Sequence, residues 1–144
     1  MGALFNNWFI WSILSAVFAG GTAVLAKAGL GGINSTLATA IRTTVVLIFT
    51  WLLVALSRSP ISLSPISRRS WIFLILSGLG TGLSWICYFR ALSVGLASKV
   101  APVDKLSVIF AISLAAIFLH ESVTWQQWVG SLFIVGGAVI IALF

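Results

Sequence analysis

The stretch Ser98-Lys99-Val100-Ala101-Pro102-Val103-Asp104-Lys105-Leu106-Ser107 leads directly into Val108 to Leu119, a run without any charge. The stretch holds two of the eight basic residues of the chain and one of its two acidic residues. Ionisable groups are expensive at membrane depth, and those that occur there usually have a function. The stretch therefore predicts a hydrophobic helix that begins at about Ala101 and carries charged groups close to its start.

The composition indicates an integral membrane protein. The 144 residues are 60% hydrophobic and 7% charged, whereas a soluble domain has about 25% charged residues. The single cysteine, Cys87, excludes a disulfide within the chain. The net charge of +6 comes without a basic run that aromatic residues interrupt, so we expect contact with the headgroups of the lipid bilayer and no nucleic-acid partner.

Five apolar stretches are long enough to cross a bilayer core, which needs about 20 residues per helix. They run from about Trp8 to Ala28, from Ser35 to Leu56, from Trp71 to Val94, from Ala101 to Leu119, and from Trp125 to the end. Thr124 and Gln127 have the spacing of a capping box, which predicts the start of the last helix. The fold class is therefore an all-α membrane protein, with five transmembrane helices in one domain over residues 1–144.

Five spans place the two chain ends on opposite sides of the membrane. One face would carry Lys27, Arg42, Arg90, Lys99, Lys105 and Asp104. The other face would carry His120, Glu121 and the polar linker from Ser57 to Ser70, which contains Arg58, Pro60, Pro65, Arg68 and Arg69. Loop positions alone put the Arg68–Arg69 side in the cytoplasm, and a count that includes the helix ends gives the opposite orientation. The orientation signal is weak.

Charged residues inside the spans are the first candidates for function. Arg42 lies about seven residues inside the second span, roughly 10 Å along a helix. Arg90 and Asp104 lie at similar distances from the turn near Ala97, so we hypothesise an ion pair between them. The alternative for Asp104 is structural: with Pro102 in the first turn, the carboxylate would interact favourably with the positive end of the helix dipole.

The lysines have a simpler interpretation. Lys27, Lys99 and Lys105 have side chains long enough to reach the headgroups. We expect Lys105, with Pro102, Asp104 and Glu121, to act as structural or gating groups rather than as direct contacts of a solute.

The third span carries a polar stripe at helical spacing. Ser77, Thr81, Ser84 and Tyr88 share one face, with Trp85 beside them. One interpretation is a solute path lined by hydroxyl and aromatic groups, to which Arg42 and Arg90 would belong. The other is close helix packing with local hydrogen bonds, because small residues let helices approach in lipid.

Enzyme chemistry finds little support in this sequence. One histidine and two acids form no metal-binding pattern, and no phosphate-binding Gly-x-x-x-x-Gly-Lys loop is present. We expect no enzyme activity, no cofactor and no metal. Any transport would be facilitated or driven by an ion gradient.

Several motifs resemble those of a known family. They are Lys27-Ala-Gly-Leu, Ala38-Thr-Ala-Ile-Arg42-Thr, Leu76-Ser-Gly-Leu-x-Thr-Gly-Leu-Ser84-Trp-x-x-Tyr88-Phe-Arg-Ala-Leu, Gly95-x-Ala-Ser-Lys-Val-Ala-Pro-Val-Asp-Lys-Leu-Ser107 and Phe118-Leu-His-Glu-Ser-Val-Thr124. Together they resemble EamA-type transporters of the drug/metabolite transporter superfamily. Glu121 matches the acid that follows Leu-Gly in that family, and His120 stands here in place of the glycine.

The resemblance implies two five-helix repeats of inverted orientation, of which this sequence contains one. It implies a secondary transporter of the inner (plasma) membrane that moves a small metabolite or drug-like solute by alternating access. A lone repeat would need a second copy, so we expect a homodimer, and we hypothesise that its two copies are antiparallel. Arg42 and Arg90 would favour anionic or zwitterionic solutes. The alternative function is a non-transporting membrane subunit that assembles with or regulates a partner.

Overall fold

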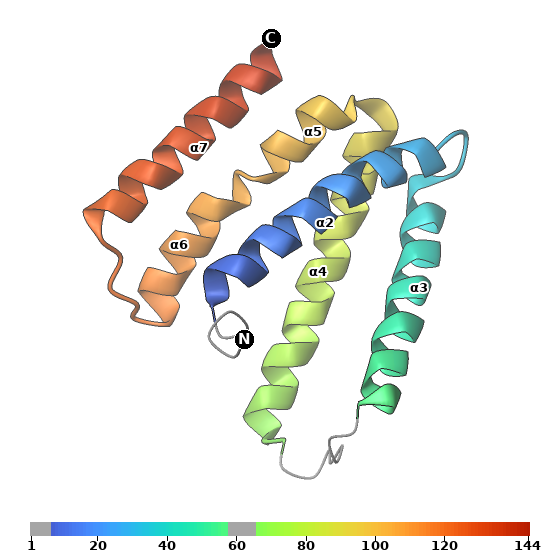
Figure 1. Ribbon diagram of the computed structural model, residues 1–144, viewed down its shortest axis with the longest axis horizontal. Coiled ribbons are helices and arrows are strands. Elements are labelled where there is room, and N and C mark those ends of the chain that lie inside the picture. Colours follow the sequence, from blue (N-terminus) through green and yellow to red (C-terminus); the bar gives the residue numbers. More distant parts are fainter. Residues whose placement is uncertain (1–6, 58–65) are drawn as a thin grey trace. The chain divides into compact units, whose positions relative to one another are not determined.

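The computed structural model describes residues 7–57 and 66–144, and all its regular elements there are helices. They are α2 (Trp8–Gly29), α3 (Ser35–Leu56), α4 (Arg68–Val94), α5 (Ala97–Asp104), α6 (Ser107–Phe118) and α7 (Trp125–Leu143) (Figure 1). Among the described residues, five segments are long and apolar enough to cross a membrane, and α5 with α6 forms the fourth of them. The predicted all-α membrane fold is confirmed. Arg58, Pro60 and Pro65 of the linker lie outside the described residues.

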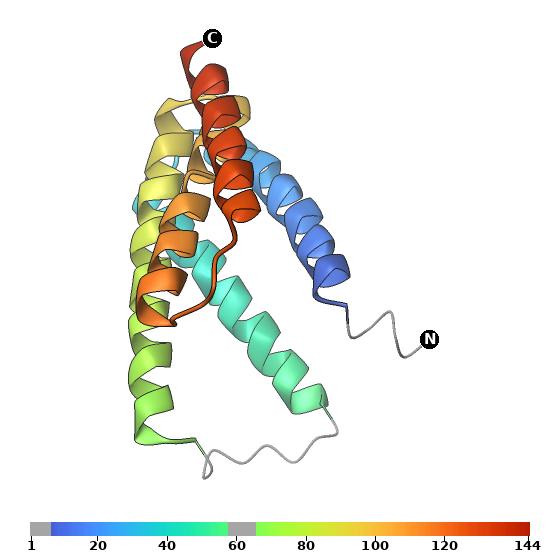
Figure 2. The ribbon, with the colours of Figure 1, turned by 90° about the vertical axis from the view of Figure 1, so that its left-hand side faces the viewer.

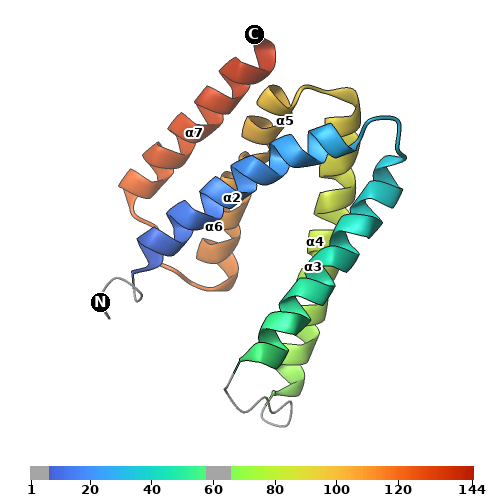
Figure 3. The same cartoon turned by 45° about the vertical axis from the view of Figure 1, so that its right-hand side comes forward.

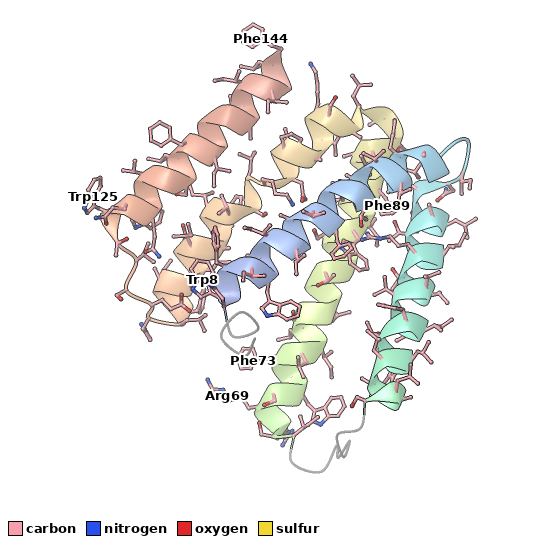
Figure 4. All side chains as sticks on the ribbon, in the orientation of Figure 1. Trp8, Arg69, Phe73, Phe89, Trp125 and Phe144 are labelled. Carbon is pink, nitrogen blue, oxygen red and sulfur yellow. The ribbon has the colours of Figure 1, made fainter. Side chains whose placement is uncertain are left out.

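The large apolar side chains of these helices face outwards. Phe18 is 72% exposed and Phe133 is 77% exposed. In water such a surface would be costly, but lipid tails are as apolar as the side chains themselves. Trp8 and Trp125 stand at the first residues of α2 and α7 (Figure 4), where an aromatic ring can sit at the membrane–water interface. The arrangement is that of helices solvated by lipid.

Polar side chains cap the starts of α3 and α4. The Asn34 side-chain oxygen accepts hydrogen bonds from the backbone N–H groups of Thr36 at 2.9 Å and Leu37 at 3.3 Å, which starts α3. The Ser67 hydroxyl accepts from the backbone N–H of Ser70 at 3.0 Å, which starts α4 at Arg68. This cap places the beginning of α4 three residues before the Trp71 expected from hydrophobicity.

The predicted capping box at the start of α7 is confirmed. The Gln127 side-chain oxygen accepts a hydrogen bond from the backbone N–H of Thr124 at 2.7 Å. One of the N–H groups that a helix start leaves without an internal partner is satisfied in this way. From this start, α7 runs alongside α5 and α6 (Figures 1 and 3).

The fourth span differs from the prediction in two ways. It begins at Ala97 rather than at Ala101, and it is interrupted after Asp104. The carbonyl of Leu96 accepts from the backbone N–H groups of Lys99 and Val100 at 3.0 and 2.9 Å, without any side-chain cap that the sequence could have signalled. Pro102 therefore lies inside α5 and not in a first turn.

Pro102 lies two residues before the interruption. Proline has no N–H to donate, and its ring clashes with the carbonyl four residues earlier. After it, hydrogen bonds join residues three apart: Lys105 N–H to the Pro102 carbonyl and Leu106 N–H to the Val103 carbonyl, both at 3.0 Å. Such bonds tighten the backbone into a 3₁₀-like turn. The fourth span is therefore a discontinuous helix with a short connection between α5 and α6 (Figure 1).

The chain divides into two compact units. Residues 29–93 form one, with α3 and nearly all of α4, and α2, α5, α6 and α7 belong to the other. In the first unit, α3 and α4 are closest near the start of α3 and the end of α4, and they diverge towards the linker (Figures 1 and 2). The functional candidates of α3 and α4 meet at this closer end.

Candidate functional site

Arg42 of α3 lies against two aromatic rings of α4. Its guanidinium carbon is 4.3 Å from the centre of the Trp85 ring and 5.5 Å from that of the Phe89 ring. Phe89 is 3% exposed and lies near the end of α4 (Figure 4). Arg42, Trp85 and Phe89 together form what we call the Arg42 cluster.

Helical spacing explains why these residues meet. Trp85 and Phe89 are four residues apart on α4, so their rings lie on one face, one above the other. Arg42 lies about 10 Å along α3 from its start at Ser35, at the end where the two helices are closest. Phe89 was not predicted as a site residue. The four-residue spacing of Phe89 from Trp85 could have indicated that the two rings share a face. That Arg42 contacts both rings depends on the position of α3, which the sequence does not show.

The two rings offset much of the cost of this charge, but neither ring is a counter-ion. A cation on an aromatic face gains from about 0.5 to about 2 kcal/mol. Placing an arginine at the centre of a bilayer costs at least about 2.5 kcal/mol. Residues 29–93 contain no aspartate or glutamate. Within the described residues, no carboxylate forms an ion pair with Arg42.

The threonine hydroxyls near the cluster donate within their own helices. Thr39 and Thr43 of α3 each donate to the carbonyl four residues earlier at 2.8 Å, and Thr81 of α4 donates to the Ser77 carbonyl at 2.9 Å. While these bonds hold, none of the three protons is available to a solute. The packing interpretation and the solute-path interpretation of the stripe both stay predictions. In either case, these three threonines can offer a neighbouring group a hydrogen-bond acceptor but no donor.

The stripe and the two arginines are only partly brought together. Tyr88 lies about one helical turn from Trp85 and is a neighbour of Arg42. Arg90 is exposed and lies about 140° around α4 from Trp85, because each residue turns a helix by about 100°. Arg90 therefore does not belong to the Arg42 cluster.

Asp104 is paired with its neighbour in sequence. Its carboxylate lies 3.3 Å from the Lys105 ammonium. Asp104 is the last residue of α5, so it lies at the negative end of that helix and not at the positive end that the sequence suggested. Asp104 and Arg90 belong to different units, and their pairing stays a prediction.

Lys27 makes a contact that the sequence did not reveal. Its ammonium donates to the Gly95 carbonyl at 2.8 Å, at the connection between α4 and α5. The acceptor is a backbone group 68 positions away in the same unit, and the expected contact of Lys27 with lipid headgroups stays a prediction. The bond fixes the end of α2 to the corner from which the discontinuous helix begins.

The break between α6 and α7 contains a left-handed residue. His120 has φ of 54°, and the N–H of Glu121 donates to the Ala115 carbonyl at 3.3 Å. The backbone here has the conformation that glycine adopts most easily, although the residue is histidine. Glu121 is exposed, and its gating role stays a prediction.

These features define a helical membrane protein. Its fourth span is discontinuous, and an arginine of its second span contacts aromatic rings of its third span. The EamA-like transporter family matches residues 6–143, and the chain belongs to this family. It is 46% identical over 139 residues to a Sinorhizobium sp. protein described as "Uncharacterized transporter in cobO 3'region", covering 96% of this chain and 99% of the relative. No solved structure matches the chain. The resemblance drawn from the sequence motifs is confirmed, and the protein is a membrane transporter.

Proposed function

We propose that this protein is a secondary transporter of the inner membrane that carries a small metabolite or drug-like solute by alternating access, as an antiparallel homodimer. The observation that supports this proposal is the number of spans. Five are half of the ten that the family resemblance implies for a complete transporter. The 139 matched residues make up 99% of the Sinorhizobium relative, so that chain also has about the length of one repeat.

Two copies in opposite orientation would restore the arrangement of an inverted-repeat transporter. In such transporters the solute site lies near the bilayer midplane between the repeats, and discontinuous helices form part of it. The break between α5 and α6 is of that kind. The weak orientation signal of the basic residues is compatible with insertion in both directions.

Labelling of the chain ends tests the antiparallel arrangement. A single cysteine is added at either terminus of a Cys87→Ser background, and intact cells and inverted vesicles are treated with a membrane-impermeant maleimide. We expect each terminus to be labelled from both sides, in comparable amounts. Labelling of each terminus from one side alone would exclude dual topology.

Reconstitution tests transport itself. Purified protein in liposomes should exchange a labelled solute at a rate that saturates with solute concentration. A protein that gives no flux with any solute class, and that co-purifies with one membrane partner in fixed ratio, would instead be a non-transporting subunit.

A further inference from the structure

We infer that the Arg42 cluster binds the anionic headgroup, a carboxylate or a phosphate, of the solute that the protein transports. This inference rests on the proposed function and names the class of substrate. It requires only residues of α3 and α4 that lie within one compact unit.

The first argument is charge. The aromatic contacts of Arg42 stabilise its charge, but neither ring carries a negative charge that would neutralise it. The chain has two acids: Asp104 is paired with Lys105, and Glu121 lies in the break after α6. Both belong to the other unit. An anion supplied from outside the chain would balance the remaining charge.

The second argument is hydrogen bonding. A guanidinium group has five N–H donors, and an aromatic ring offers it charge stabilisation but no lone pair. The neighbouring threonines already donate their protons within their own helices. Arginine commonly pairs with carboxylates and phosphates through two parallel hydrogen bonds. The donors of Arg42 are of the type that such a headgroup requires.

The third argument is position. The Arg42 guanidinium carbon lies 4.3 and 5.5 Å from the centres of the Trp85 and Phe89 rings of α4. A lipid phosphate has the same chemistry as a solute phosphate, but arginines that reach headgroups extend along the helix towards the interface. The cluster lies about 10 Å from the start of α3, in a hydrocarbon core about 30 Å thick. This position favours a solute within the membrane over a headgroup at its surface.

Binding to purified protein in an uncharged maltoside detergent tests the inference. The probes share one apolar body and differ in charge: benzoate, phenyl phosphate, benzamide and benzylamine. We expect at least one anion to raise the melting temperature of the wild type, and the neutral and cationic probes to leave it unchanged. Arg42→Gln should weaken anion binding at least tenfold. Arg42→Lys should also weaken it, because lysine keeps the charge but not the planar donor group.

The same helix provides a matched control. Arg69 also lies over an aromatic ring, with its guanidinium carbon 5.7 Å from the centre of Phe73 near the opposite end of α4 (Figure 4). Arg69→Gln removes an arginine–aromatic contact of the same kind. It should leave anion binding unchanged.

A measurement on the wild type covers the case in which the Arg42 variants do not fold. Phenylglyoxal modifies arginine side chains, and mass spectrometry identifies the modified residue. Benzoate or phenyl phosphate should slow the modification of Arg42 severalfold and leave that of Arg69 unchanged. If neither anion protects Arg42, or if folded Arg42→Gln binds anions as the wild type does, the inference is wrong.

Further outcomes distinguish a lipid anion from a solute anion, and the anion site from the transport function. Protection of Arg42 by phosphatidylglycerol but by neither soluble anion would assign the cluster to lipid headgroups and overturn the inference. Saturable flux of neutral or cationic solutes that does not change in Arg42→Gln would support transport while overturning the anion site. Anion binding through Arg42 without any flux would support the site and contradict the transporter proposal.

Discussion

His120 has a backbone conformation that glycine adopts more easily than histidine. Its φ of 54° lies in the left-handed region, which costs most L-residues about 1–2 kcal/mol and glycine almost nothing. Histidine, like asparagine, tolerates this region better than most residues, which explains how the turn after α6 survives. The sequence identified the position as the place of a family glycine, and the structure shows that the turn has kept the glycine conformation.

We therefore expect His120→Gly to stabilise the protein by about 0.5–1 kcal/mol. His120→Val should destabilise it, because a branched side chain fits this conformation poorly. Thermal unfolding in detergent measures both changes. Ser122→Gly is the control in the same break and should give no gain, since φ of Ser122 is not positive. A loss of stability in His120→Gly would show that the imidazole makes a stabilising contact.

Lys27 is the second residue for which one observed contact predicts an effect on stability. Lys27→Met keeps the apolar stem and removes the ammonium that bonds to the Gly95 carbonyl. We expect a loss of about 1.5–3 kcal/mol, the usual range for a hydrogen bond with a charged partner. Lys99→Met is the control and should change the unfolding free energy by less than about 0.5 kcal/mol. Equal effects of the two variants would mean that the Gly95 contact contributes little.

At the scale of the element, sequence reasoning succeeded where a boundary has a local chemical cause. Trp8, Ser35 and Trp125 were predicted as helix starts and are the first residues of α2, α3 and α7. The predicted start of the fourth span was four residues too late. Leu96 precedes the helix without a side-chain cap, so no residue before Pro102 indicates in the sequence where the helix begins. The contact of Arg42 with Trp85 and Phe89 depends on how α3 and α4 lie together, which no single-helix pattern contains.

Pro102→Ala tests the cause of the break between α5 and α6. Alanine restores an N–H that can donate to the Ser98 carbonyl, so we expect the helix to continue through Lys105 and Leu106. Amide hydrogen exchange at those two residues should slow at least tenfold, and solute flux should fall while the protein remains folded. Val103→Ala, which keeps the proline, is the control. Unchanged exchange in Pro102→Ala would assign the break to another cause.

At the scale of the whole molecule, the odd number of spans has a consequence for gene fusions. If all five candidate spans cross the membrane, the chain ends on the side opposite to its start, and a second copy joined directly behind it is inverted. We expect this direct tandem fusion to transport solute at the rate of the separate chains. A fusion with one inert transmembrane helix between the copies forces a parallel pair, and its flux should be lost. Flux in both fusions would contradict the antiparallel dimer.

The hydroxyl bonds of the threonines affect how the helices can move. The hydroxyl groups of Thr39, Thr43 and Thr81 each donate a hydrogen bond to a carbonyl of the same helix. A bond of this kind travels with its helix, so α3 and α4 can shift past each other without breaking any of these three hydrogen bonds in a medium that offers no water to replace them. If the protein alternates between two openings, as proposed above, these surfaces would let the two helices slide past each other with little resistance. The cation on the Trp85 ring would then be one of the few polar contacts that resists the motion.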